Sequence, residues 1–402
     1  MIDVQEAVRA LGSGPLSEDS LVRFIYPLFS QVLQRTGNEV YLANHSLGRP
    51  LDQTARDVQH ALQLWYEKMD DAWEDWLTER DSFRHHVARL INAPSPDCVV
   101  PKTSAGQGLR TVLNCYHDKI NVVTTRDEFD SVDVILKVYA QQGRINLTRI
   151  GPGKDGEYRA ADILGAVDES TDLIVVSMVL FTTGQWLTDL PQLIAAAHAR
   201  DARVLVDIYH AAGVIPLDIQ HTDADFAIGG CYKYLRGGPG ACWLYLHPRH
   251  LGGALQTLDT GWFAQAVPFA FERPASPQFA AGGNAFLEST PTILPFYQAR
   301  AGLEFVLALG VDRLREYALK QQLRLRELLS ERNIKGLGTP AECGAFVAIP
   351  HNKAAEVSQE LLAKGVRTDA REGLLRMCPD ILNTGQELLL AVDCLSEISK
   401  KQ

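Results

Sequence analysis

Short apolar runs alternate with longer amphipathic stretches through the middle of the chain. The short runs are rich in Val, Ile and Leu, as buried strands are, and the longer stretches repeat apolar residues at helical spacing. The predicted strands are Cys98–Val100, Ile120–Thr124, Asn146–Ile150, Leu173–Met178, Arg203–Asp207, Asp225–Ile228 and Cys242–Leu246. The helices predicted between them are Gly106–His117, Asp130–Gln141 and Leu190–Arg200. This alternation predicts βαβ units, and therefore an α/β fold with a mostly parallel sheet.

The pattern changes after Gln265–Gly283, a segment rich in Pro, Ala, Phe and Gly that is predicted to be a long irregular loop. The elements predicted beyond it are a long helix over Phe296–Arg332, a strand over Ala345–Ile349, a helix over Asn352–Lys364, a strand over Gly373–Met377 and a helix over Gly385–Ser399. We therefore predict a large domain over residues 50–284, and a smaller α+β domain formed by residues 1–49 and 285–402.

The composition, 46% hydrophobic and 22% charged, is that of an ordinary soluble enzyme. A net charge of −10 without a long basic run argues against nucleic-acid binding. The seven cysteines are scattered and contain no C-x-x-C pair, which indicates free thiols in a reducing compartment and no metal site. The first residues lack a secretory pattern, and no apolar stretch approaches the roughly 20 residues of a membrane span. We therefore expect a cytoplasmic protein with no membrane or nucleic-acid partner.

An aspartate and a lysine follow two of the predicted strands. Asp207 ends the strand Arg203–Asp207, and Lys233 follows the strand that begins at Asp225. Because active sites in such sheets lie at the carboxyl ends of the strands, the two side chains are expected to converge. Pyridoxal 5'-phosphate (PLP) needs this pair: a carboxylate keeps its pyridine nitrogen protonated, and a lysine forms a Schiff base with its aldehyde. The sequence therefore predicts PLP as the cofactor.

Three further segments fit the rest of that cofactor. Residues 101–108 follow a strand and open a helix, so their backbone N–H groups can close on a phosphate beside the Ser104 hydroxyl. Phe129 follows the strand Ile120–Thr124, where its ring can lie flat on the pyridine. Ser177 lies near the end of another strand. Taken singly, these features also fit ordinary structural roles, such as a helix cap or a core aromatic ring.

Several motifs, in order along most of the chain, carry a resemblance to a known family. They are Tyr41-Leu-Ala-Asn-His-Ser-Leu-Gly48, Asp127-Glu-Phe129, Ser177-Met-Val-Leu-Phe-Thr-Thr-Gly-Gln185, Asp207-Ile-Tyr-His210, Tyr232-Lys233-Tyr-Leu235, Gly261-Trp262-Phe263, Ser289-Thr290-Pro291 and Leu375-Arg376-Met377. In these motifs the chain resembles the kynureninases, hydrolases of the PLP-dependent fold type I, class V aminotransferase superfamily. The resemblance implies a large PLP-binding domain with a mostly parallel central sheet and a smaller α+β C-terminal domain.

The resemblance also implies a role for each matching residue. Lys233 would hold PLP and move the substrate's Cα proton, Asp207 would bind the pyridine nitrogen, and Tyr232 would serve as an acid or contact the phosphate. If the chain there is extended, Tyr232 would point away from Lys233. The residues implied around the cofactor are Ser104, Ala105, Phe129, Ser177, Asp207, His210, Tyr232, Lys233, Trp262 and Thr290.

The implied substrate is an amino acid whose α-carboxylate Arg376 would bind, with Asn44 and Ser46 as further substrate contacts. Arginine suits that task because its guanidinium matches a carboxylate with two parallel hydrogen bonds. The family's counterpart of Trp262 reaches the phosphate from the partner subunit. The resemblance therefore implies a homodimer with shared active sites.

Departures from the family pattern fall mainly among the substrate contacts. The family's Gly-His after the tryptophan is Ala264-Gln265 here. Its Gly-His and Pro-Trp segment, which helps to hold the aromatic end of the substrate, has no counterpart in Glu67–Trp76. Its phosphate-binding threonine is Ala105, and the aspartate that follows the stacking phenylalanine is Val132. The cofactor contacts are thus mostly kept, whereas the substrate contacts are partly rebuilt.

Three functions therefore stay open. The first is hydrolytic Cβ–Cγ cleavage of kynurenine, or of a related aryl or acyl amino acid, to alanine and an acid. The second is a class V aminotransferase or β-lyase reaction on another amino acid, and the third is a non-catalytic PLP-binding homologue. A cysteine desulfurase would need a mobile nucleophilic cysteine, and neither Cys343 nor Cys378 is in a long flexible loop by sequence.

Overall fold

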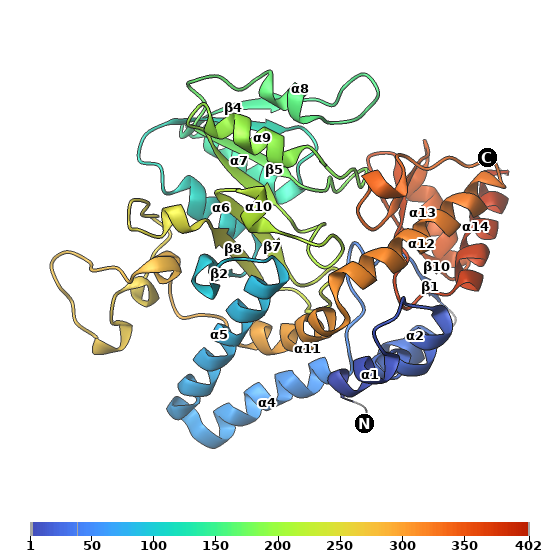
Figure 1. Cartoon of the computed structure of the whole chain (residues 1–402), viewed down its shortest axis with the longest axis horizontal. Helices are drawn as coiled ribbons and strands as arrows, with labels where there is room; N and C mark the ends of the chain where they lie inside the picture. Colours follow the sequence, from blue (N-terminus) through green and yellow to red (C-terminus); the bar gives the residue numbers. More distant parts are fainter. Residues whose placement is uncertain (1–2, 38, 401–402) are drawn as a thin grey trace.

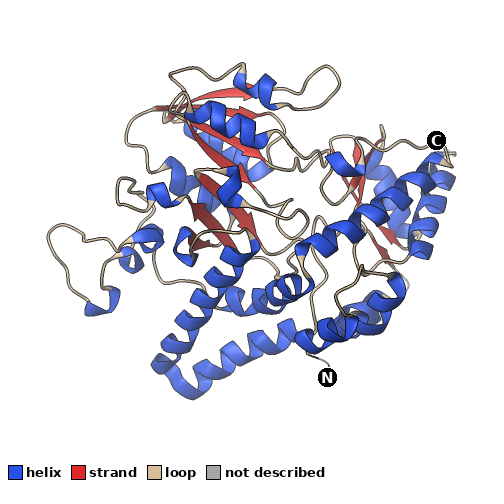
Figure 2. Cartoon of the chain, viewed as in Figure 1, coloured by secondary structure: helices blue, strands red, loops and turns tan. Residues whose placement is uncertain are grey.

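A seven-stranded sheet forms the centre of the larger part of the molecule (Figure 1, Figure 2). The computed structural model describes residues 3–37 and 39–400. The strands of this sheet are β2 (Val99–Lys102), β3 (Ile120–Thr125), β4 (Ile145–Ile150), β5 (Leu173–Ser177), β6 (Arg203–Asp207), β7 (Phe226–Gly230) and β8 (Cys242–Leu246). Their order is β2-β8-β7-β6-β5-β3-β4; β8 pairs antiparallel with both of its neighbours, and the other pairs are parallel. All seven predicted strands are confirmed, with small shifts at their ends.

Helices cover both faces of the sheet, which explains why its strands are apolar throughout. The helices of this part are α4 (Gln53–Lys68), α5 (Ala72–Leu90), α6 (Ala105–Leu113), α7 (Asp130–Gln141), α8 (Ala160–Leu164), α9 (Leu190–His198), α10 (Ile219–Thr222) and α11 (Leu294–Leu309). Side chains of α6 and α7 share a core with Val175 of β5, and side chains of α5 and α9 share the opposite core with Ile174. Both residues are fully buried, because successive strand side chains point to opposite faces.

The smaller part is built around a three-stranded antiparallel sheet in the order β11-β12-β9. Its elements are α12 (Val311–Ser330), β9 (Val347–Pro350), α13 (Ala354–Ala363), β10 (Val366–Arg367), β11 (Asp369–Arg371), β12 (Leu374–Met377) and α14 (Gly385–Ser399). The N-terminal segment adds α1 (Val4–Leu11), α2 (Glu18–Phe24), α3 (Ser30–Thr36) and β1 (Val40–Tyr41). The N-terminal segment contacts this part through the pairing of β1 with β10. The predicted domain boundaries stay predictions; α11, which lies beyond residue 284, packs on α4 and α5.

The single long helix predicted over Phe296–Arg332 was wrong. Gly310 divides it into α11 and α12, because this residue has a φ of 88°, which few residues other than glycine adopt. The Gly310 N–H still donates to the Val306 carbonyl and closes the last turn of α11. The separate α12 then leads into the smaller part (Figure 1).

The expected irregular loop is confirmed over Gln265–Gly283. Its central stretch contains one short 3-10 helix, Pro268–Ala270, and extends away from the body of the molecule (Figure 1). The hairpin of α4 and α5 projects nearby, and the rings of Trp73 on α5 and Phe263 lie 6.4 Å apart. No helix within residues 3–37 and 39–400 is long and apolar enough to cross a membrane.

Candidate active site

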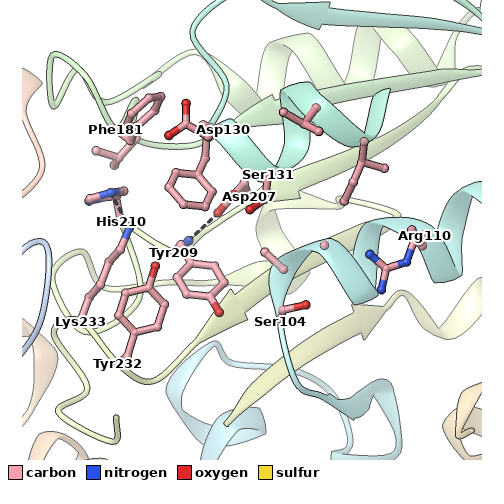
Figure 3. A pocket seen from close by; sticks show the side chains of 17 residues that line it. Ser104, Arg110, Asp130, Ser131, Phe181, Asp207, Tyr209, His210, Tyr232 and Lys233 are labelled. Carbon is pink, nitrogen blue, oxygen red and sulfur yellow. Dashed lines mark hydrogen bonds between the residues drawn. The ribbon is translucent and has the colours of Figure 1, made fainter. Parts of the chain in front are cut away.

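A cavity of about 590 Å³ lies at the carboxyl ends of β3, β5 and β6 (Figure 3). Eight of the residues that the sequence placed around the cofactor line it, namely Ser104, Ala105, Phe129, Ser177, Asp207, His210, Tyr232 and Lys233. They come from segments far apart in the chain, which converge because the carboxyl ends of parallel strands meet at one edge of the sheet. The structure thus brings most of the predicted cofactor contacts into one place.

Asp207 is the last residue of β6 and lies beside Ser177 at the end of β5. One carboxylate oxygen accepts the N–H of Tyr209 at 2.8 Å. The other makes no hydrogen bond to the described residues and belongs to the cavity wall. Burial raises the pKa of Asp207, and the charge of Lys233 opposes that shift. A buried carboxylate with one free oxygen is suited to a protonated ring nitrogen.

Lys233 is buried among aromatic rings on the opposite side of the cavity. Its Nζ lies 5.5 Å from the ring centre of Phe129, 5.4 Å from that of Tyr209 and 5.6 Å from that of Tyr232. Burial lowers the pKa of the ammonium group, and the charge of Asp207 works against this. A lysine in such surroundings loses its proton more easily than an exposed one, and only the neutral amine attacks an aldehyde.

His210 contacts Lys233 directly. The distance from Lys233 Nζ to His210 Nε2 is 2.6 Å, and His210 Nδ1 lies 3.1 Å from the Tyr234 hydroxyl. Burial, aided by the charge of Lys233, holds the pKa of His210 well below its ordinary value, so the ring is neutral. The neutral ring accepts a hydrogen bond from Lys233 at Nε2 and carries its own proton at Nδ1, towards Tyr234. Its expected role beside the cofactor stays a prediction.

Tyr232 faces the same cavity as Lys233. The condition for opposite orientation is not met, because the chain over residues 231–235 forms bends and a turn. Burial raises the pKa of Tyr232 to about 12, so its hydroxyl keeps its proton at neutral pH. The neighbouring Tyr209, which sequence reasoning missed, also lines the cavity, and its hydroxyl lies 2.7 Å from Cys242 Sγ.

Glu128 is a second functional candidate that sequence reasoning missed. Its carboxyl group is buried, accepts the Ser177 hydroxyl at 2.6 Å and the Thr125 hydroxyl at 2.7 Å, and lies 3.2 Å from the Ser177 N–H. Burial raises its pKa to about 7. The signal available in the sequence was its position immediately before Phe129. Glu128 fixes the Ser177 hydroxyl at the floor of the cavity.

Arg376 lies on β12, outside the cavity wall but next to it. Its Nε and Nη2 donate to the two oxygens of Asp369, at 2.7 and 2.6 Å, and its Nη1 donates to the carbonyl of Phe181, a cavity residue. Asp369 also lies 2.9 Å from His45 Nε2. Burial alone would raise the pKa of Asp369, but hydrogen bonds from His45 and Arg376 outweigh it and hold the carboxylate charged. The guanidinium is therefore fixed in place beside the cavity.

The other predicted contacts lie away from the cavity wall. Asn44 is buried and donates to the Cys378 carbonyl at 2.8 Å, whereas Ser46 is exposed. The indole N–H of Trp262 donates to the Thr290 hydroxyl at 3.2 Å, on the side of the exposed loop. These four residues stay predictions, and for Trp262 and Thr290 the prediction involves a second subunit.

Cys343 and Cys378 do not have the surroundings of a nucleophilic cysteine. Both thiols are buried, and burial raises the pKa of each. Activated cysteines have lowered pKa values and lie where a substrate can reach them. Neither thiol belongs to the cavity wall.

Comparison with known proteins agrees with this geometry. The family model Aminotransferase class-V matches residues 56–367. A kynureninase of Deinococcus radiodurans is 31% identical over 372 residues, covering 87% of this chain and 85% of the relative. A kynureninase of Bacillus mycoides is 28% identical over 397 residues, covering 93% and 91%.

Solved structures share the fold. A complex of the cystine C-S lyase C-DES with cysteine persulfide has a TM-score of 0.82 at 19% identity and covers 91% of this chain and 99% of its own. A mutant of C-DES with glycine covalently linked to PLP also has a TM-score of 0.82 at 19% identity, covering 92% and 98%. At this identity the similarity establishes the architecture alone.

Proposed function

Because the chain belongs to the class-V aminotransferase family, whose members use PLP, we propose that it hydrolyses the Cβ–Cγ bond of kynurenine or of a related aryl or acyl amino acid. The products would be alanine and an aryl or acyl acid. The observation that carries this proposal is the similarity to kynureninases over 85% or more of both chains. The proposed site is the cavity between Asp207 and Lys233.

The side chains of the cavity wall suit PLP. A buried carboxylate lies at the end of β6, and the same wall holds a buried lysine and the ring of Phe129, whose centre lies 5.5 Å from Lys233 Nζ. We assign Lys233 to the aldehyde carbon, Asp207 to the ring nitrogen and Phe129 to one ring face, with Ser104 and Ala105 at the phosphate. When bound, PLP withdraws electrons from the α-carbon of an attached amino acid.

Lys233 is the proposed base that removes the Cα proton and returns it later. Its lowered pKa leaves a useful fraction of neutral amine near neutral pH. The hydrogen bond to neutral His210 holds Nζ in position without adding a positive charge next to it. Tyr232, which keeps its hydroxyl proton, is the proposed acid when the Cβ–Cγ bond breaks.

Arg376 is the proposed anchor for the α-carboxylate of the substrate. Asp369 accepts from Nε and Nη2, and the Phe181 carbonyl accepts one N–H of Nη1, which leaves one N–H on Nη1 and one on Nη2 for a second carboxylate. A rigidly held fork loses little conformational entropy on binding, and lysine does not reproduce its two parallel hydrogen bonds. The substrate would thus be oriented with its α-carbon towards Lys233.

A homodimer is also part of the proposal. Trp262 and Thr290 contact each other but do not line the cavity, so a phosphate contact from them requires a second copy. The rings of Phe269 and Phe271 beside Trp262 are 47% and 73% exposed, and such patches are typical of interfaces. We further propose the cytoplasm as location, since the cysteines are free thiols.

A substrate panel tests the reaction. Purified protein loaded with PLP is incubated with L-kynurenine and 3-hydroxykynurenine, and the products are identified by chromatography. Alanine together with an anthranilate supports the proposal. A keto acid with pyridoxamine phosphate would indicate transamination, and ammonia with pyruvate would indicate elimination. Absence of turnover of either kynurenine, in protein that shows the absorption band of lysine-bound PLP, would reject hydrolysis of kynurenine.

A further inference from the structure

Arg110 lies at the end of the cavity that is remote from Lys233 (Figure 3). It belongs to α6, whose first residue is Ala105 and whose N-cap is Ser104. Helix side chains lean towards the N-terminus, and Arg110 Nη1 lies 3.5 Å from the position that a Cβ atom would take on Gly106. The guanidinium therefore lies over the first turn of α6, beside Gly106.

The guanidinium has no partner of its own. Arg110 makes no side-chain hydrogen bond or ion pair with the parts of the chain that the structure describes, and it is exposed to the cavity. The other basic groups among the described wall residues, Lys233 and His210, are engaged with each other at the opposite end. The carboxylate of Asp130, also on the wall, lies beside Phe181 and away from Arg110 (Figure 3). A positive charge is thus available at this end.

The first turn of α6 otherwise offers an anion little beyond backbone groups. Neither Ala105 nor Gly106 carries a hydroxyl, and the Ser104 oxygen accepts the N–H of Gln107 at 3.1 Å, which leaves one side-chain O–H to donate to a phosphate. The free N–H groups of the turn and the helix dipole favour a phosphate but neutralise only part of its charge. A guanidinium adds a full charge and up to two hydrogen bonds with matching geometry.

We propose that Arg110 is a phosphate-binding residue of the PLP site and takes the place of the missing threonine hydroxyl. Arg110 folds back over Gly106 and meets the phosphate where the amides of Ala105 and Gly106 point. The glycine keeps this turn close to α7, because a Cβ there would lie 2.9 Å from Ile135 Cδ1. This inference rests on PLP binding at Lys233 and is independent of which amino acid is cleaved.

The test compares PLP with pyridoxal, which lacks the phosphate. Dissociation constants of both are measured by absorbance titration of the apoprotein for the native chain, Arg110→Gln, Arg110→Lys and the control Arg89→Gln, which changes an exposed arginine of α5 outside the cavity. We expect Arg110→Gln to weaken PLP binding roughly 10-fold, as losing one charge-assisted contact does, and to leave pyridoxal binding unchanged. Arg110→Lys should recover part of the loss, and Arg89→Gln should match the native chain.

Two results would overturn the proposal. One is an unchanged dissociation constant for PLP in Arg110→Gln. The other is an equal loss for PLP and pyridoxal, which would mean that the substitution disturbs the cavity and not the phosphate contact. Because no amino acid is present in the titration, a failure of kynurenine cleavage leaves this result intact, and the two proposals fail separately.

Discussion

The two ends of the cavity are built differently. At the Lys233 end, side chains are buried and bound to one another, as in the contact of Lys233 with His210 and that of Ser177 with Glu128. At the Ser104 end, Arg110 is exposed and makes no side-chain hydrogen bond or ion pair with the described residues, and Trp262 and Thr290 lie away from the cavity wall. The side chains around Lys233 are therefore positioned before a cofactor binds, whereas in our proposals Arg110 gains its partner only with the phosphate, and a second subunit supplies Trp262 and Thr290.

The strongest test of the organised end is Lys233→Ala. Without the amine the substrate's Cα proton has no base, so we expect turnover to fall on the order of 10³-fold or more. Borohydride should no longer attach PLP to the protein, which peptide mapping can verify. The matched control is Lys137→Ala, an exposed lysine of α7 that pairs with Asp133. Turnover that survives in Lys233→Ala would place the base elsewhere.

Glu128 provides a pH test of the same end. Burial raises its folded pKa to about 7 from 4.5, so between these values the folded state holds a proton that the unfolded state has lost. Stability therefore falls as pH rises through this window, by on the order of 3 kcal/mol from this group. We expect Glu128→Gln to lose that slope. Denaturant unfolding of both proteins at pH 4.5 and 7 measures the difference, from which other titrating groups cancel.

The control variant is Glu6→Gln, which changes an exposed glutamate of α1. It should show the same pH dependence of stability as the native chain. If the Glu128→Gln protein shows the same slope as the native chain, the buried carboxyl group is not the titrating group. Burial of Glu128 would then not raise its pKa, and the Lys233 end would be more accessible to water than the structure indicates.

Asp369→Asn tests whether the anchor for the substrate is as rigid as the Lys233 end. Asparagine keeps one acceptor but turns N–H groups towards Arg376, so the guanidinium should lose its fixed orientation. We expect KM for the amino acid to rise roughly 10-fold with kcat little changed, since the contact is made equally in the ground and transition states. Arg376→Lys should give a larger rise with an intact PLP spectrum. A fall in kcat alone would argue against a positioning role for Asp369.

The smallest effect is expected at the exposed aromatic segment. Phe271 is 73% exposed, and its ring stacks on Trp262 with 6.2 Å between the ring centres. Phe271→Asp replaces this ring with a charged carboxylate. If this segment lies between two copies, the dimer dissociation constant should rise about 10-fold, as for the loss of one partly buried ring. Sedimentation velocity over a range of concentrations measures it, with Leu323→Asp on α12 as the control. Equal behaviour of both variants would remove the aromatic segment from the interface.

The strands of the central sheet and the cofactor of the protein, PLP, could both be predicted from the sequence alone. Strands buried on both faces are apolar throughout, so their positions were visible without any knowledge of their neighbours. Asp207 is the last residue of such a strand, and Phe129 and Lys233 lie a few residues beyond two others. The edge of a parallel sheet brings such positions together. Local pattern and motif were therefore enough to select eight residues that line one cavity; their contacts with the cofactor stay predictions.

The contacts between distant segments could not be predicted from the sequence and became visible only in the folded structure. Periodicity continues across Gly310, so the break between α11 and α12 was not visible, and the bend around Lys233 turned Tyr232 into the cavity. The pairing of β11 with β12 placed Asp369 against Arg376, and the approach of the N-terminal segment added His45. Spacing along a chain fixes which way a side chain points within its own element, whereas its partners depend on how elements pack. For Arg110, the position over Gly106 follows from its own helix, but the packing of α6 on α7 places that helix face at the cavity.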